Sequence, residues 1–517
     1  MMAKLTDYVS YEDAHRHFSK EALWDLFDGD RDHLNISQEC LDRHERDRTA
    51  VRIAHGDGQS EVHTFGALSD LSGRFANWLI HRGIGKGERV AIMLEPSVEF
   101  YAALFGTMKA GAVAVPLFTA FGPDGLASRL DDCAPKLLLL APEKVGLAGT
   151  SGIETVIADS AFLAEVEAQD AAFTPHTSSS DMAMYQYTSG TSREIPEAVK
   201  HRHRAVVTVI IAALYATGVR PGDKYMCPSS PAWGHGLWHG TLAPLALGVE
   251  IASYAGKFDA ARLLDAIEEF EITNLSAAAT HYRMMRNHGD DRARIFKLEK
   301  LSFTGEPLDT ETAHWAREIF GQDVCSIYGS TEVGVIIASY PGAPDLPVKV
   351  GSLGRPMPGC GVAILDAKGE ACAPGAIGEI MLRRGEGWFQ VKDLGSVDAE
   401  GYYFHHGRAD DVIISAGWTM SAVEIEDVLL KHPNVDEAAV IGVPDDDRGQ
   451  VVKAFIISSR PAGDTFTKEL QNFARERLSL HEYPRLVAIV DALPKTPAGK
   501  VNRKVLREAE RQSKEQT

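Results

Sequence analysis

Hydrophobic positions along the chain alternate between helical spacing and short continuous runs. Between residues 63 and 83 the apolar side chains recur every three or four positions, which predicts a helix with one buried face, formed by Phe65, Leu68, Leu71, Phe75, Trp78 and Leu79. "RVAIMLE" (89–95) and "AVAVPL" (112–117) are uninterrupted runs typical of buried strands, and a helix-type segment separates them. This order of strand, helix and strand predicts a parallel sheet covered by helices.

The same alternation continues for about 400 residues. From residue 410 a more compact series begins, with a helix at 421–432, strands at 437–443 and 451–457, a helix at 467–478 and a strand at 485–490. About 105 residues suffice for a small domain. We therefore predict an α/β N-terminal domain, residues 1–409, with mainly parallel sheets flanked by helices. A small α+β domain, residues 410–517, follows it.

A loop rich in hydroxyl groups follows the strand-like run "MAMYQY". Small residues let backbone N–H groups and hydroxyls converge on anionic oxygens, so this loop is expected to bind phosphates. Its candidate ligands are Thr188, Ser189, Gly190, Thr191 and Ser192. Ligands collect at such strand ends in open α/β sheets. The rest of the loop, "REIPEA" (193–198), places Glu194 and Glu197 where a phosphate would favour positive charge.

The composition narrows the class of partner. The chain has 517 residues, of which 44% are hydrophobic and 24% charged, as in soluble globular proteins of two or more domains. A formal net charge of −19 argues against a broad surface for nucleic acid or anionic membranes. We see no secretory signal and no apolar run of about 18 residues that could span a membrane. The six cysteines form no C-x-x-C pair, so we expect reduced thiols and a cytoplasmic location. Whether the chain forms a homo-oligomer is left open.

Four separated motifs then point to one family. "YTSGTS" (187–192), "YGSTE" (328–332), "GRADD" (407–411) and "LPKTPAGKVNRKVLR" (493–507) occur in the order and at the spacings of the adenylate-forming enzymes. From about residue 20 to 510 the chain resembles that superfamily of acyl-CoA synthetases, peptide-synthetase adenylation domains and firefly-type luciferases. Within it, the sequence is most similar to AMP-forming acyl-CoA ligases for short- and medium-chain or aryl acids.

The resemblance implies two half-reactions that use ATP, Mg²⁺ and CoA. A carboxylate attacks the α-phosphorus of ATP, and CoA's thiol then attacks the acyl-adenylate. Because negative charge meets negative charge in the first step, positioned cations and N–H donors are needed. By resemblance Lys500 bridges the carboxylate and the α-phosphate, Thr331 bonds the α-phosphate, and Glu332 binds Mg²⁺. Asp410 is the expected hinge of the small domain, and Gly417 flanks the pantetheine.

The nucleotide site is likewise carried over from the family. Gly305, Glu306 and Pro307 of "GEPL" correspond to the segment along the adenine, with Tyr328 on the other face of the ring and Gly329 and Ser330 beside it. Asp393 matches the aspartate that holds the ribose hydroxyls, assisted by Arg408.

This sequence departs from the family pattern at four places. Glu197 stands at the position of the usual phosphate-loop lysine, with one residue inserted before it. Val391 and Lys392 replace the usual Thr-Gly before Asp393, and Ser326 stands where an Asp or Asn often meets the adenine. In the small domain, Thr419 replaces a frequent arginine.

Two interpretations of the altered loop follow. Either Arg193 or Lys200 supplies the displaced charge, which is the interpretation we favour, or the protein is a catalytically weakened nucleotide or acyl-CoA binder. A third hypothesis is an adenylation enzyme that loads a separate carrier protein.

The acid is expected to bind behind "YGSTE" and beside "PSSPAWGHGLWHG" (228–240). Acetate-specific relatives carry a tryptophan at the position of Gly329, so an acid larger than acetate is expected. Trp233 and His235 are candidate lining residues. An aromatic wall and an uncharged imidazole suit a medium-chain, branched, hydroxy or aromatic acid of fatty-acid or aromatic-acid metabolism.

Overall fold

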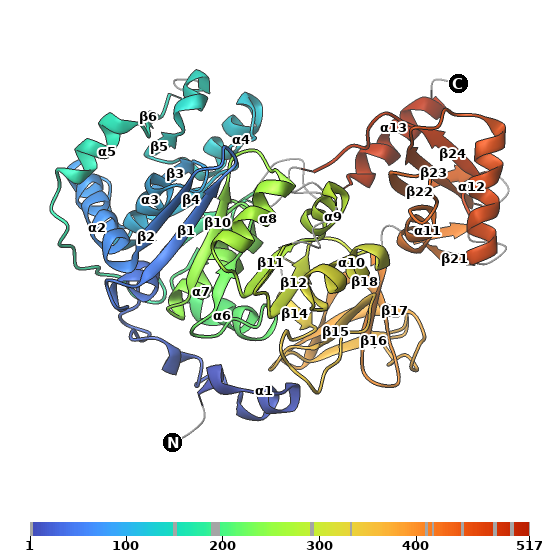
Figure 1. The fold of residues 1–517 in the computed structure, drawn as a ribbon, viewed down its shortest axis with the longest axis horizontal. Helices are drawn as coiled ribbons and strands as arrows, with labels where there is room; N and C mark the ends of the chain where they lie inside the picture. The colour runs from blue at the N-terminus through green and yellow to red at the C-terminus, as the bar shows by residue number, and fades with distance from the viewer. Residues whose placement is uncertain are drawn as a thin grey trace. The chain divides into compact units, whose positions relative to one another are not determined.

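The fold is described from a computed structural model of the chain (Figure 1). It describes residues 4–515, apart from 148–151, 188–196, 290–293, 331–332, 409–411, 416–417, 446–448, 479–482 and 497–500. The chain divides into two compact units. Unit 1 comprises residues 1–350 and 356–359, and unit 2 comprises 351–355 and 360–517. The predicted hinge, Asp410, lies outside the described residues, so the domain boundary stays a prediction.

The first sheet of unit 1 is built from the runs that the sequence marks as buried strands. Its order is β6 (Glu154–Ile157), β5 (Leu137–Leu140), β3 (Arg89–Met93), β4 (Val113–Pro116), β7 (Met182–Gln186) and β8 (Val199–Arg202). All neighbours are parallel except β7 and β8, which pair antiparallel on either side of the phosphate-type loop. Strands β3, β4 and β5 are almost wholly buried, as expected of strands covered on both faces.

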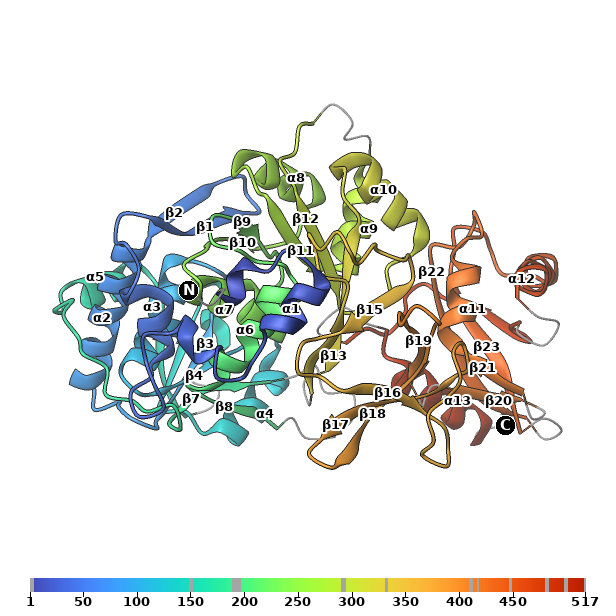
Figure 2. The same cartoon turned by 90° about the horizontal axis from the view of Figure 1, so that it is seen from below.

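Helices cover this sheet. The helices α2 (Phe65–His81) and α3 (Val98–Lys109) lie side by side (Figures 1 and 2). Both begin at a hydroxyl N-cap, Thr64 and Ser97, whose side-chain oxygen accepts a backbone N–H of the first turn. The helix α4 (Pro123–Cys133) packs Leu126 and Leu130 into a hydrophobic cluster with β3, β4 and β5.

The second sheet of unit 1 has the order β14 (Gly334–Ala338), β13 (Val324–Ser330), β12 (Lys300–Thr304), β11 (Asn274–Ala278), β9 (Lys224–Met226), β10 (Glu250–Ala255), β1 (Thr49–His55) and β2 (Ser60–Thr64). The strands from β13 to β1 are parallel, and β14 and β2 pair antiparallel with their neighbours. Helices α8 (Ala260–Glu269), α9 (Ala279–His288) and α10 (Thr310–Phe320) share a hydrophobic core with it.

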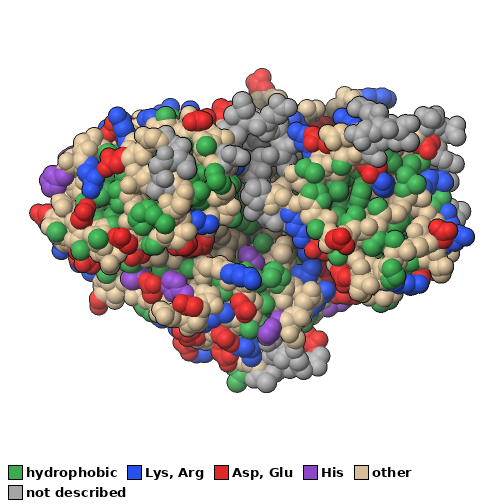
Figure 3. Space-filling view, turned by 90° about the horizontal axis from the view of Figure 1, so that it is seen from above, with side chains coloured by type: hydrophobic (Ala, Val, Ile, Leu, Met, Phe, Trp, Pro, Cys, Tyr) green, Lys and Arg blue, Asp and Glu red, His purple; other side chains and the backbone are tan. Residues whose placement is uncertain are grey.

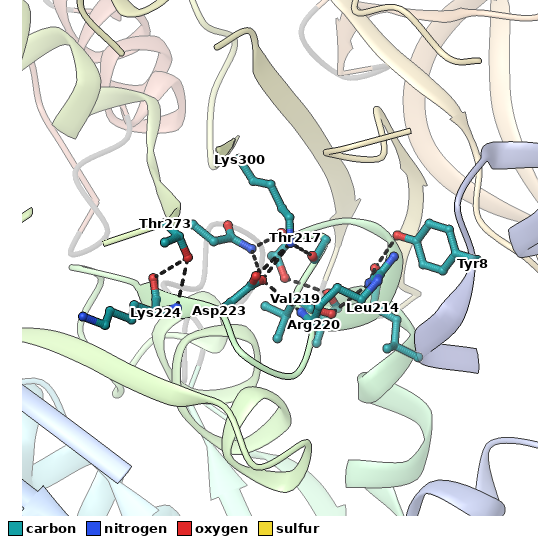
Figure 4. Close-up of polar contacts among 12 residues, drawn as sticks. Tyr8, Leu214, Thr217, Val219, Arg220, Asp223, Lys224, Thr273 and Lys300 are labelled. Atoms are coloured by element: carbon teal, nitrogen blue, oxygen red, sulfur yellow. Dashed lines mark hydrogen bonds and ion pairs between the residues drawn. The ribbon is translucent and has the colours of Figure 1, made fainter. Parts of the chain in front are cut away.

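A polar network fixes the start of β12 and the N-terminal segment (Figure 4). The carboxylate of Asp223 accepts bonds from Lys300 Nζ at 2.9 Å and from the Asn274 amide at 3.2 Å. The guanidinium of Arg220 lies 3.7 Å from the centre of the Tyr8 ring, whose hydroxyl donates to the carbonyl of Leu214. Because the charges and the amide pair with one another, their burial costs less than it would for unpaired groups.

Among its described residues, unit 2 combines three helices with strands that pair antiparallel, except for β23 and β24, which are parallel. One group has the order β16 (Val362–Leu365), β17 (Gly378–Arg384), β18 (Gly387–Val397), β19 (Tyr403–Arg408) and β15 (Ser352–Pro356). A hairpin, β20 (Val412–Ser415) with β21 (Trp418–Ser421), precedes a sheet of β22 (Glu437–Asp445), β23 (Gly449–Ile457) and β24 (Leu486–Ile489). The helices are α11 (Ala422–Leu429), α12 (Asp464–Arg477) and α13 (Arg503–Glu515). Its cores draw on the last three strands and on all three helices.

The predicted fold class is confirmed. A large α/β region with mainly parallel sheets precedes a smaller α+β region, and the helices and strands expected at residues 65–117 and 421–490 are present. Within the described residues, the helices lack the length and apolar character that a membrane crossing requires. Acidic and basic side chains are interspersed on the face shown in Figure 3.

Candidate active site

Several predicted site residues lie outside the described part of the chain: Lys500, Thr331, Glu332, Thr188, Ser189, Gly190, Thr191, Ser192, Asp410 and Gly417. The backbone of Arg408 is described and its side chain is not. The site is therefore built from the segments that flank these residues, each within its own unit.

The adenine-type segment and the "YGSTE" motif lie at the ends of neighbouring strands. Strands β12 and β13 are parallel, with Phe303 opposite Ser326, so both carboxyl ends meet at one edge of the sheet. The hydroxyl of Thr304 donates to the carbonyl of Ile327 at 3.2 Å and ties the two ends together. Gly305 follows with φ of +101°, a left-handed conformation that favours glycine. The structure thus brings Gly305, Glu306 and Pro307 next to the strand that carries Tyr328, Gly329 and Ser330.

The side chain of Glu306 is held by helix α9. Its Oε1 accepts a hydrogen bond from the Thr280 hydroxyl at 2.8 Å and one from Arg283 Nη1 at 3.1 Å. The carboxylate therefore fixes the turn after β12 rather than standing free. If the segment binds adenine as the family pattern suggests, its backbone would lie along the ring, because the Glu306 side chain is engaged elsewhere.

Gly329 is required by its own hairpin. A Cβ atom added there would lie 2.0 Å from the carbonyl oxygen of Gly334, where β13 and β14 pair with a shift of register. The obstacle is backbone, which no side-chain rotation can relieve. The prediction that Gly329 leaves room for a larger acid stays a prediction, and the structure adds a second reason for glycine that the sequence did not indicate.

One carboxylate, that of Asp132, contacts the residue on each side of the phosphate-type loop; we call these two residues, Tyr187 and Ala198, the stems of the loop. The Tyr187 hydroxyl lies 2.7 Å from Asp132 Oδ2 on α4, and the backbone N–H of Ala198 donates to the same oxygen at 3.1 Å. The Tyr187 hydroxyl also lies 2.8 Å from the Arg129 carbonyl, so its single proton has two acceptors. Burial is the main cause that raises the pKa of Tyr187 above its ordinary value. Asp132 was not a predicted site residue.

Lys200, one candidate for the displaced loop charge, lies opposite Tyr185 across β7 and β8. Its Nζ is 5.2 Å from the centre of the Tyr185 ring. The ammonium thus rests against an aromatic face at an exposed strand position, a weak cation–π contact from which it can be withdrawn. Arg193, the other candidate, lies outside the described residues.

Both ring nitrogens of His235 already have hydroxyl partners. Nδ1 lies 3.0 Å from Ser229 Oγ, and Nε2 lies 2.9 Å from Ser276 Oγ. Burial lowers the pKa of His235 well below its ordinary value, so the ring is neutral at pH 7. The role of this imidazole in lining an acid pocket stays a prediction. A substrate hydroxyl that bonded to it would have to displace a serine.

The segment that follows Trp233 is anchored to the first sheet. Trp233 is half-buried, with its ring centre 5.4 Å from that of His235. Trp238 Nε1 donates to Gln186 Oε1 at 2.8 Å, and a Cβ on Gly234 would lie 2.7 Å from the same amide. Since Gln186 ends β7, directly before Tyr187, the expected acid-binding segment and the phosphate-type loop share one anchor.

In unit 2, Asp393 lies on β18 opposite Arg408 on β19. Asp393 is buried, with its side chain 11% exposed, and one carboxylate oxygen is 3.9 Å from His405 Nε2. Lys392, just before it, has φ of +67°. Its left-handed backbone explains in physical terms why the family pattern has glycine at this position.

A hollow of about 530 Å³ in unit 1 is lined by other residues. It lies at the carboxyl ends of β1, β3, β5 and β10, and its lining includes His55, Glu95, Glu143 and Lys257. None of the predicted site residues that the structure describes lines it. Its acidic lining offers little to a nucleotide's phosphates.

Comparisons with known proteins agree with this arrangement. Residues 38–390 match the model of the AMP-binding enzyme family, and residues 424–500 match that of the AMP-binding enzyme C-terminal domain. Acetyl-coenzyme A synthetase of Bacillus subtilis (strain 168) is 30% identical over 96% of this chain and 94% of its own length.

Two solved structures share the fold. A Brucella canis acyl-CoA synthetase is 32% identical, with a TM-score of 0.75 over 98% of this chain and 100% of that one. An anthranilate CoA ligase in complex with anthranoyl-AMP is 25% identical, with a TM-score of 0.84 over 95% of this chain and 99% of that one. The chain belongs to the AMP-binding enzyme family, the adenylate-forming superfamily that its four motifs indicate.

Proposed function

We propose that this protein is an AMP-forming acyl-CoA ligase for a carboxylic acid larger than acetate. The observation that carries the proposal is the meeting of "GEPL" and "YGSTE" at the ends of parallel strands β12 and β13. Gly305 has a positive φ that favours glycine, and because glycine has no side chain, the backbone of that turn can closely approach a flat ligand such as adenine. These features fit ATP as a substrate.

In the first half-reaction the acid's carboxylate displaces pyrophosphate from the α-phosphorus. Lys500 would neutralise the carboxylate and the α-phosphate as they approach, and Thr331 would donate a hydrogen bond to the phosphate. Residues 188–192 would hold the departing phosphates, while Asp393 and Arg408 would bind the ribose. Mg²⁺ would enter with ATP, neutralise phosphate charge and be held by Glu332. Among the described residues, no group of three or more His, Cys, Asp or Glu could hold a metal.

In the second half-reaction CoA's thiol attacks the acyl-adenylate carbonyl and AMP leaves. The small domain, residues 410–517, would turn about Asp410 so that Gly417 comes to flank the pantetheine. The two family models leave residues 391–423 between them, and this interval contains the proposed hinge.

The acid is assigned to the space beside Trp233, His235 and Gly329. A half-buried indole and a neutral imidazole favour an apolar or aromatic acid over a dicarboxylate. The related anthranilate ligase acts on an aromatic acid and supports this size class. Cys40, Cys133, Cys227, Cys325 and Cys372 form no disulfide, which supports a reducing compartment such as the cytoplasm.

A second candidate function rests on Glu197. This carboxylate is exposed directly before the loop stem at Ala198, where a phosphate-binding lysine is usual in the family. Its repulsion of the phosphates would favour a nucleotide or acyl-CoA binder with weak turnover. A carrier-protein adenylation enzyme is the third, and would release AMP without CoA.

The test is pyrophosphate release from purified protein with ATP, Mg²⁺ and CoA across straight, branched, hydroxy and aromatic acids, acetate included. The ligase predicts release that depends on one class of acid and collapses in Lys500→Ala. Preference for acetate would overturn the size assignment. Saturable ATP binding without pyrophosphate, relieved by Glu197→Lys, would establish the binder instead.

A further inference from the structure

The segments before and after Lys500 contact each other and the core of unit 2. Lys495 and Val501 form an antiparallel bridge, and the backbone N–H of Asn502 donates to the carbonyl of Pro494 at 2.7 Å. Residues 497–500, which lie between these contacts, are outside the described part of the chain. Leu493 and Leu506 pack with β22 and β23 in one hydrophobic cluster.

Arg503, three residues after Lys500, makes a bidentate ion pair with Glu426. Its Nε lies 3.1 Å from Oε1, and its Nη2 lies 2.5 Å from Oε2. The Glu426 side chain is almost fully buried, and its Oε1 also accepts the backbone N–H of Val440 at 2.6 Å. One carboxylate therefore joins α11, β22 and the first residue of α13.

The geometry of this ion pair restricts the direction in which the chain enters helix α13. A guanidinium fork meets a carboxylate with two parallel bonds, whereas lysine offers only a point charge. Removing Arg503 would leave the nearly buried Glu426 carboxylate without its bidentate partner, so the pair holds the start of α13 to α11 and β22. Because Arg503 and the Val501 bridge both follow Lys500 within three residues, they fix where the chain leaves that lysine.

We infer that Glu426 and Arg503 are positioning residues for Lys500 in the adenylation step. The inference rests on the proposed function, in which Lys500 acts on the α-phosphate in the first half-reaction and the small domain then turns for the second. A shift of about 1 Å in a group that acts in the transition state can lower a rate on the order of a hundredfold. Loss of the fork should thus reduce one half-reaction and spare the other.

The experiment compares Arg503→Lys and Glu426→Gln with wild type in the two half-reactions separately. Adenylation is followed as acid-dependent pyrophosphate release, and thioester formation is followed from synthetic acyl-adenylate and CoA. We expect adenylation to fall about tenfold to a hundredfold and thioester formation to change by less than about twofold. Arg511→Lys is the matched control, since Arg511 lies exposed on the same helix, and it should leave both unchanged.

Equal losses in both half-reactions, or none in either, would overturn the inference. A second readout does not depend on turnover: trypsin cleavage after Lys500 in the folded protein should be faster in Glu426→Gln than in wild type. If wild type releases no pyrophosphate with any acid, the proposed function fails. The cleavage rates then still show whether the Glu426–Arg503 pair restrains the chain around Lys500. Unchanged rates would contradict that restraint as well.

Discussion

The hydroxyl of Tyr187 lies 2.7 Å from the carboxylate of Asp132, which also accepts the backbone N–H of Ala198 at 3.1 Å. Tyr187 precedes the phosphate-type loop and Ala198 follows it, so a residue of α4 sets the distance between the two stems. A loop that binds phosphates through converging N–H groups depends on this spacing.

Replacement of Tyr187 by phenylalanine tests this anchor. The change removes one hydrogen bond between the buried Tyr187 side chain and the exposed Asp132, and we expect it to lower the free energy of unfolding by about 1 kcal/mol. It should also raise KM for ATP more than it lowers kcat. Urea unfolding and steady-state pyrophosphate release measure the two effects. Tyr185→Phe, two residues earlier on β7, is the control, and an equal effect there would remove Tyr187 from this role.

Lys392→Gly should stabilise the protein. Lys392 has φ of +67°, and a non-glycine residue in that region costs roughly 1–2 kcal/mol. Glycine gives back part of the gain because its unfolded chain is more flexible, so the net increase in unfolding free energy is expected to be up to about 1 kcal/mol. Lys392→Ala keeps the strain and should not stabilise. A melting temperature that rises equally in both variants would assign the effect to the lost charge.

The buried strands of unit 1 can be predicted because each is a continuous run of apolar residues. β3 and β4, with α3 between them, follow from residues 89–117 alone. The hydrogen-bond partners of the site residues, in contrast, come from positions far away in the sequence. Asp132 lies 55 residues before Tyr187, and Ser276 lies 41 residues after His235. A single sequence carries no local signal for such pairs, whereas the four motifs indicate the family because their spacing is itself a pattern.

Gly329→Ala separates the two explanations of that glycine. The added Cβ would meet the Gly334 carbonyl oxygen at 2.0 Å, so the hairpin must shift. We expect a loss of stability of at least about 2 kcal/mol, within the range for overpacking, and a similar fractional loss of activity with every acid. A filled pocket would instead penalise large acids selectively. Gly122→Ala, where a Cβ meets nothing within 4 Å, is the control for thermal unfolding.

His203 makes stability depend on pH below 6.5. Its Nδ1 accepts the backbone N–H of Ile36 at 3.1 Å, and its side chain is fully buried. Burial is the main cause that lowers the pKa of His203 from 6.5 to about 4, while Asp181 raises it and Lys86 lowers it. Since the unfolded chain takes up the proton first, this contribution is complete above pH 6.5. It is lost as pH falls towards 4.

The size of the His203 effect follows from the shift between those two pKa values, about 3 kcal/mol when it is fully developed. His44, His201, His239 and His281 also have pKa values lowered to about 4, so the wild-type curve should fall more steeply than one histidine allows. The difference between wild type and His203→Gln isolates the single group. Urea unfolding at pH 7.5, 6 and 5 should show this difference shrinking as pH falls, because glutamine cannot be protonated. Parallel curves would mean that His203 takes up its proton in the folded protein as readily as in the unfolded chain.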